Sequence, residues 1–247
     1  MSPDEFVREY EQLLAELELR YFNKVLRNKR RFIEAVAAQV LLTGTPQLPK
    51  PEVAAEALAA ELQAAREQVY QSFDRFGPLS KRQIGLGIDV EGRRLRYLAG
   101  QYFAQHGLAR TRLQHQTTIN DLKTVIAQGI DEGQASAEIA RQIVKSGVDV
   151  TRQRAGAIAR TETHGAIMRV HNDVGQQAQL AGFRVKKEWV SATDERVRIS
   201  HQIANGQAVD QDEYFVVNGE RLMHPGDPEG SAANVINCRC TIIHRVV

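Results

Sequence analysis

Residues able to hold a metal ion gather near the carboxyl end of the chain. The last fifty positions contain both cysteines, Cys238 and Cys240, and three of the seven histidines. Thiolate and imidazole are the ligands that Zn²⁺ prefers, so Cys238, Cys240, His201 and His224 are candidate zinc ligands. The Cys-x-Cys spacing is tighter than that of most zinc motifs. The structural alternative is a pair of buried thiols, with Arg239 directed away to a carboxylate.

A carboxylate close to this cluster raises a hydrolytic alternative. Asp194 precedes His201 by seven positions, and a metal-dependent nuclease or related hydrolase could combine them with Cys238 and Cys240. The sequence contains no Gly-rich phosphate loop, no Gly-x-Ser-x-Gly elbow and no His-Glu-x-x-His pair. The prediction is therefore a binding protein rather than an enzyme, with no catalytic residue and no required cofactor, zinc being the open option.

Two charged residues in a helical stretch need partners from elsewhere in the chain. Arg160 and Glu162 are two positions apart, so they cannot face each other on a helix. Asp194 and Arg198 offer opposite charges, and His201 lies just beyond them. We predict that these five residues form a polar network between the helices and the C-terminal segment.

The C-terminal segment reads as a small β-containing unit. Val185–Val190 alternates as a strand does, and Cys240–Ile243 is a further strand candidate. Glu213–Val217 and Glu220–Met223 flank Asn218-Gly219, a dipeptide typical of tight hairpins.

The first part of the chain reads as a long helical hairpin. Apolar residues at three- and four-residue steps predict a helix from Ser2 to about Leu42. The stretch 43–51 contains three prolines and breaks it, and a second helix spans Glu52 to Phe76 and stops at Gly77-Pro78. A short turn is expected at Gly85–Asp89.

Three further helices are predicted in the middle of the chain from capping residues and glycines. They are a helix from Asp121 to Glu132 capped by Asn120, one from Ala137 to Lys145 capped by Ser136 and ended by Ser146-Gly147, and one from Thr151 to Gly182. The fold class is α+β and mainly α: an N-terminal long helical hairpin, a helical layer and a small C-terminal β-containing unit. The expected domains are 1–78 (hairpin), 79–119 (basic and aromatic connecting helical region) and 120–247.

Composition bounds the function classes. The chain has 247 residues, a net charge of +2 and 43% hydrophobic residues, which is ordinary globular usage. No apolar run is long enough to span a membrane, and Met1–Arg20 does not resemble a signal peptide. Two cysteines one residue apart argue against a secreted disulfide scaffold.

Two local basic patches are candidates for DNA contact, although the net charge is close to zero. One lies in the first helix and the other lies among aromatic residues before the middle helices. The DNA-contact candidates are Arg27, Lys29, Arg30, Arg31, Arg93, Arg94 and Arg96. The alternative is a solvated helix face.

An ordered series of short motifs resembles a known family. The series comprises Ser136-Ala-Glu-Ile-Ala140, Arg154-Ala155, Ile158-Ala-Arg-Thr-Glu-Thr163, Trp189, Asp194-Glu-Arg-Val-Arg198 with His201, Gly206-Gln207, Pro225-Gly-Asp227 and Asn237-Cys-Arg-Cys240. It resembles the phage Mu F-like minor head proteins, also called the phage head morphogenesis domain, over about Asn120 to Ile243. Many members have His-Pro before Asn-Cys-Arg-Cys, where this chain has Val235-Ile236.

The resemblance implies a minor capsid protein of a tailed bacteriophage or prophage. Such a protein would bind the portal inside the procapsid and could contact packaged DNA during packaging and ejection. Its expected partners are the portal protein, the major capsid or scaffolding protein, and DNA without sequence preference, with no membrane. Its expected location is the inside of the virion head, and the host cytoplasm during assembly.

Overall fold

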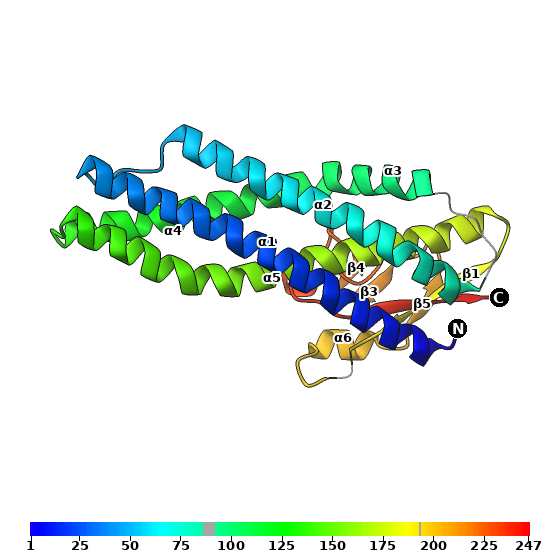
Figure 1. The fold of residues 1–247 in the computed structure, drawn as a ribbon. Coiled ribbons are helices and arrows are strands. Elements are labelled where there is room, and N and C mark those ends of the chain that lie inside the picture. The colour runs from blue at the N-terminus through cyan, green and yellow to red at the C-terminus, as the bar shows by residue number, and fades with distance from the viewer. Residues whose placement is uncertain (86–91, 193) are drawn as a thin grey trace.

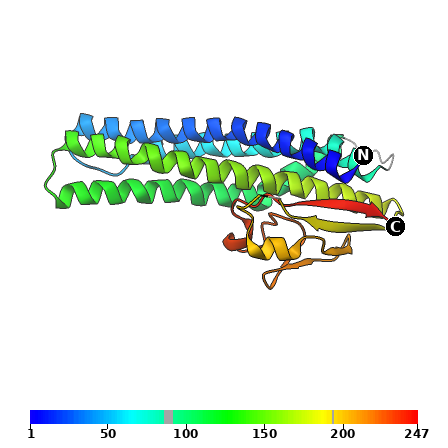
Figure 2. The ribbon, with the colours of Figure 1, turned by 90° about the horizontal axis from the view of Figure 1, so that it is seen from below.

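Four long helices form an elongated bundle that carries a small β-containing unit on its side (Figures 1 and 2). The computed structural model describes residues 1–85, 92–192 and 194–247. The bundle consists of α1 (Pro3–Thr43), α2 (Pro51–Ile84), α4 (Leu108–Asp131) and α5 (Ser136–Leu180). Helix α3 (Gly92–Tyr102) and the π-helical turn η1 (Phe103–Gly107) lead into α4. The prediction of a mainly α, α+β fold is confirmed.

Helix α1 matches the helix predicted from its sequence pattern. Ser2 and Glu5 form a capping box, in which each side chain accepts a hydrogen bond from the other residue's backbone N–H. The apolar stripe that begins at Phe6 and Tyr10 is buried along the helix. The helix ends at Gly44, which has the left-handed conformation (φ of 64°) common at helix C-termini.

The predicted end of the second helix at Gly77-Pro78 is wrong, because α2 continues to Ile84. A Cβ atom on Gly77 would lie 2.6 Å from Leu95 Cδ1, so this glycine allows α3 to approach α2. Leu79 and Ile84 beyond it are buried. Proline removes one helical hydrogen bond, and burial of the following turn offsets that loss.

The predicted helix ends around Ser146-Gly147 and Thr151 are also wrong, since α5 runs unbroken through them. A Cβ on Gly147 would lie 2.9 Å from Ile33 Cδ1, so the glycine serves close packing between α5 and α1. The Ser146 hydroxyl donates a hydrogen bond to the Gln142 carbonyl, so this polar side chain has a partner inside the helix.

Two predicted N-caps lie in other positions. Asn120 is inside α4, which begins twelve residues earlier at Leu108. Ser136 is the first residue of α5, where the N-cap is Ala135, and its hydroxyl donates to the Gly44 carbonyl at 2.7 Å. That bond joins the turn between α4 and α5 to the end of α1, so both turns lie at one end of the bundle (Figure 1).

The C-terminal unit contains the predicted strands. Strand β1 (Val185–Val190) lies between β2 (Ala208–Asp210) and β5 (Thr241–Val246) in an antiparallel sheet. The hairpin of β3 (Phe215–Val217) and β4 (Glu220–Leu222) turns at Asn218 and Gly219, with φ values of 52° and 77°. Two short helices, α6 (Ile199–Ala204) and α7 (Ala232–Val235), complete the unit.

The apolar cores cross the predicted domain boundaries. One core joins Phe6 of α1, Phe73 of α2, Ile167 of α5 and Ile243 of β5. The boundaries expected after residues 78 and 119 fall inside α2 and α4, so neither coincides with a break between elements. The turn expected at 85–89 lies, beyond Gly85, outside the described residues. No helix in the described part of the chain is long and apolar enough to cross a membrane.

Candidate functional site: a buried histidine–cysteine cluster

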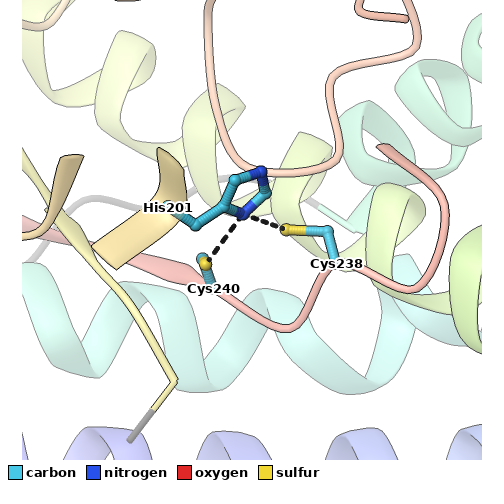
Figure 3. Close-up of side chains that lie close together, drawn as sticks. All are labelled: His201, Cys238 and Cys240. Atoms are coloured by element: carbon cyan, nitrogen blue, oxygen red, sulfur yellow. Dashed lines mark hydrogen bonds between the residues drawn. The ribbon is translucent and has the colours of Figure 1, made fainter. Parts of the chain in front are cut away.

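One histidine and both cysteines converge in the core of the C-terminal unit (Figure 3). His201 comes from α6, and Cys238 and Cys240 come from the segment between α7 and β5. His201 Nδ1 lies 3.3 Å from Cys240 Sγ and 3.7 Å from Cys238 Sγ, and the three atoms all lie within 4.8 Å of one another. Each of the three residues is at most 2% exposed. The cluster therefore combines two soft ligands and an imidazole in a site shielded from solvent.

The chain turns sharply just before the cysteines, and α5 holds that turn. Asn237 has a φ of 58°, a left-handed conformation that asparagine tolerates better than most residues. Its backbone N–H donates to Thr161 Oγ1 at 3.1 Å, and its side-chain oxygen accepts from Arg160 Nη1 at 2.8 Å. Arg160 and Thr161 thus fix the direction in which the chain enters the cluster.

A histidine of α5 fixes the position of Cys240. His164 Nε2 donates to the Cys240 carbonyl at 2.7 Å. A Cβ on Gly226 would lie 2.6 Å from His164 Nδ1, so the loop can pass this ring only with a glycine there. Burial lowers the pKa of His164 to about 4, so the ring is neutral at pH 7.

Arg239 points away from the sulfurs, as the structural alternative expected. Its guanidinium binds Asp194 through two hydrogen bonds, one of them 2.6 Å long. These bonds hold the pKa of Asp194 well below its usual value. Asp194 is therefore paired with a cation and does not face the cluster.

The thiols interact with each other as well as with His201. The proximity of the two sulfurs lowers the pKa of Cys240 and raises that of Cys238. Contact with His201 further lowers the pKa of Cys240. Trp189 packs against the cluster, with its ring edge to face against the His201 ring at a centroid separation of 5.5 Å.

The five residues of the predicted polar network have partners other than one another, which corrects that prediction. Glu162 accepts from Arg110 at 3.1 Å and from Gln114 at 3.3 Å. Arg198 donates to the Ile236 carbonyl, while Arg160, Asp194 and His201 make the contacts already described. Residue types and spacing alone do not distinguish among charged partners so distant in the chain.

Neutral histidines make contacts between α5 and β5 that were not predicted from the sequence. His171 Nε2 donates to the Ile242 carbonyl at 3.0 Å, and its Nδ1 accepts from Ser80 Oγ at 2.6 Å. Burial lowers the pKa of His171 to about 3. His164 and His171 are seven positions apart, a spacing that places both on one face of a helix. This spacing is the feature of the sequence that indicates a shared contact surface.

His224 does not join the cluster, which corrects its prediction as a ligand. Its Nδ1 donates to the Pro225 carbonyl at 3.0 Å, and it is not part of the group of ligand atoms within 4.8 Å. The ring is buried, and burial lowers its pKa to about 4.

The structure separates the seven DNA-contact candidates into two kinds. Lys29 is buried and pairs with Glu61 at 3.3 Å, so it cannot reach a phosphate, and its prediction is wrong. The other six have exposed side chains, although Arg96 lies 3.9 Å from Asp74: Arg27, Arg30, Arg31, Arg93, Arg94 and Arg96.

Comparison with known proteins identifies the family. The model of the phage Mu protein F like family matches residues 120–243, half of the chain, and the chain belongs to that family. The match contains α5, strands β1 to β4, the first half of β5 and the histidine–cysteine cluster.

Two curated proteins are similar to this chain. The Minor head protein GP7 of Bacillus phage SPP1 is 29% identical over 132 residues, which is 53% of this chain and 42% of that protein. A protein of Enterococcus faecalis named NAD(+)--arginine ADP-ribosyltransferase EFV is 37% identical over 122 residues, which is 49% of this chain and 24% of that protein. The chain therefore spans less than half of either relative. No solved structure matches it significantly.

The family and the phage relative support a role in head morphogenesis of a bacteriophage.

Proposed function

We propose that this protein is a minor head protein that binds the portal inside the procapsid, with the major capsid or scaffolding protein as its other neighbour. It would assemble in the host cytoplasm and remain inside the virion head. Membership of the Mu protein F like family carries this proposal, and the similarity to a named minor head protein supports it.

The end of the bundle remote from the C-terminal unit is the surface best suited to dock on a partner. We call it the bundle tip. It consists of the end of α1, the loop to α2 and the turn between α4 and α5, and its large exposed apolar side chains are Leu41, Leu42, Leu48 and Ile130. Leu42 is 87% exposed. Clustered exposed apolar residues favour protein–protein contact.

Leu42→Asp is expected to weaken binding to the portal ring at least about tenfold, because a carboxylate would be desolvated in the interface. Co-purification of the untagged chain with a tagged portal ring measures this effect. The matched control is Leu180→Asp, since Leu180 is 78% exposed at the opposite end of α5. Equal loss in both variants, or none in Leu42→Asp, would refute docking through the bundle tip.

DNA contact is a finer part of the same proposal. Arg27, Arg30 and Arg31 are exposed within about one turn of α1, and they line a hollow of about 540 Å³ together with Glu34. Contact of these guanidinium groups with phosphates would make binding fall steeply with salt. A titration of DNA affinity against salt, compared with the triple alanine variant, would test it.

The mode of action that we infer is binding rather than catalysis. A hydrolase using Asp194, His201, Cys238 and Cys240 would need an accessible cleft, but the cluster is buried and Asp194 is bound to Arg239. The ADP-ribosyltransferase named above shares only 24% of its length with this chain, so its named activity is not carried over.

A further inference from the structure

We propose that His201 Nδ1, Cys238 Sγ and Cys240 Sγ bind a Zn²⁺ ion that acts as a structural staple of the C-terminal unit. This proposal is independent of portal docking. It rests on the distances between the three atoms, on the hydrogen bonds that they cannot all make, and on the surroundings that hold them in place.

The distances match the edges of a zinc tetrahedron. Zn–S bonds of about 2.3 Å and Zn–N bonds of about 2.05 Å, at tetrahedral angles, place nitrogen and sulfur about 3.6 Å apart. The two observed separations from His201 Nδ1 are 3.3 Å and 3.7 Å, one on each side of that value. A small movement of the ring would equalise them.

Without an ion, the cluster leaves polar atoms poorly satisfied. An imidazole nitrogen has a single in-plane site, which holds either a proton or a lone pair, so His201 Nδ1 can make one good hydrogen bond but faces two sulfurs. His201 Nε2 is also buried without a hydrogen-bond partner. A cation between the three atoms would satisfy the Nδ1 lone pair and both sulfurs together.

The ligands are positioned by contacts outside the cluster. Asn237 is held by Arg160 and Thr161, and the Cys240 carbonyl is held by His164. Arg239 faces Asp194, so the residue between the two cysteines is fixed as well. Ligands held in this way lose little conformational freedom when they bind an ion.

The surroundings favour a structural role. The core of this unit is small and consists of Trp189, Ala204, Phe215, Val217, Leu222, Ile242 and the two cysteines. Small cores often need a metal ion or another cross-link. Among the described residues, no fourth histidine, cysteine or carboxylate belongs to the group, so a water molecule would complete the tetrahedron. Burial of all three ligands keeps substrates away from the ion.

Zinc content tests the proposal directly. The untagged chain, produced with zinc and dialysed against metal-free buffer, is expected to retain about one zinc per chain by plasma mass spectrometry. The Cys238→Ser/Cys240→Ser variant should retain less than about a tenth of that. The matched control is His106→Gln, which removes a histidine near Glu229 and should keep full zinc content.

Cobalt spectroscopy keeps the test valid if the double variant fails to fold. Co²⁺ added to the metal-free wild-type chain should give a sulfur-to-cobalt charge-transfer band in the near ultraviolet, which reports thiolate ligands. Cys238→Ser should lower the band to about half, because one of two thiolates is lost. Wild-type protein that holds no more zinc than the double variant, or that shows no such band, would overturn the proposal.

Discussion

Lowering the pH from 7 to 5 is expected to reduce the free energy of unfolding by about 4–8 kcal/mol. The cause is a set of four buried histidines, His164, His171, His224 and His244. Burial lowers the pKa of each, to about 4, 3 and 4 for the first three and well below its usual value for His244. A loss of this size is comparable with the whole stability of a typical domain.

The folded and unfolded chains bind different numbers of protons, and this difference explains why stability falls as the pH is lowered. The pKa of these imidazoles is near 6.5 in the unfolded chain, so that chain binds more protons than the folded chain between about pH 6.5 and 4. Stability is fully present above that window and is lost as the pH falls through it, at about 2 kcal/mol per histidine by pH 5. Asp173 and Glu18 act in the opposite direction, because burial raises their pKa values. The expected loss of stability is therefore smaller than the sum of the four histidine contributions.

Urea unfolding at the two pH values measures the loss. The midpoint should fall at pH 5 while the dependence on urea stays the same. His171→Phe keeps an aromatic ring against Phe6 and Phe76 and should remove about a quarter of the pH-dependent loss. Midpoints that agree at pH 7 and 5 would show that these rings are not held neutral in the folded chain.

Lys29→Met is expected to lower the free energy of unfolding by about 3–5 kcal/mol, measured by urea unfolding at pH 7. Lys29 lies inside the bundle, where Nζ contacts Glu61 Oε1 at 3.3 Å and donates to Thr118 Oγ1 at 2.8 Å. The side chains of Lys29 and Glu61 are only 2% and 6% exposed. Removing the ammonium group leaves the Glu61 carboxylate buried without its cation.

Two further variants separate this effect from a simple loss of packing. Lys29→Met/Glu61→Leu should recover most of the lost stability, because both charges are then absent. Lys24→Met removes the matching exposed pair between α1 and α2, Lys24 with Glu67, and should cost less than about 1 kcal/mol. Similar losses for Lys24→Met and Lys29→Met would contradict the assigned role of burial.

The strands of the C-terminal unit could be predicted because their signals are local. The alternation of buried and partly exposed side chains identifies β1. The dipeptide Asn218-Gly219 identifies the hairpin without reference to residues elsewhere in the chain. The continuity of α2 and α5 could not be predicted, because Gly77 and Gly147 serve contacts with Leu95 and Ile33 instead of ending a helix. A glycine that ends a helix and one that lets another helix approach look alike in a single sequence.

The candidate site also contains residues that could be predicted from the sequence and residues that could not. Cys238, Cys240 and His201 were predicted together from ligand type alone, and they lie together. His224 has the same chemistry but binds a neighbouring carbonyl, and Lys29 sits in a basic run but faces the bundle interior. Which side of a helix is buried depends on partners far away in sequence, so composition could not distinguish Lys29 from Arg30.

Recruitment by the portal can be measured by quantifying this chain in purified proheads assembled with and without the portal. Portal-containing proheads are expected to carry the protein, and portal-free proheads are expected to have lost nearly all of it. Equal amounts in both preparations would contradict recruitment by the portal.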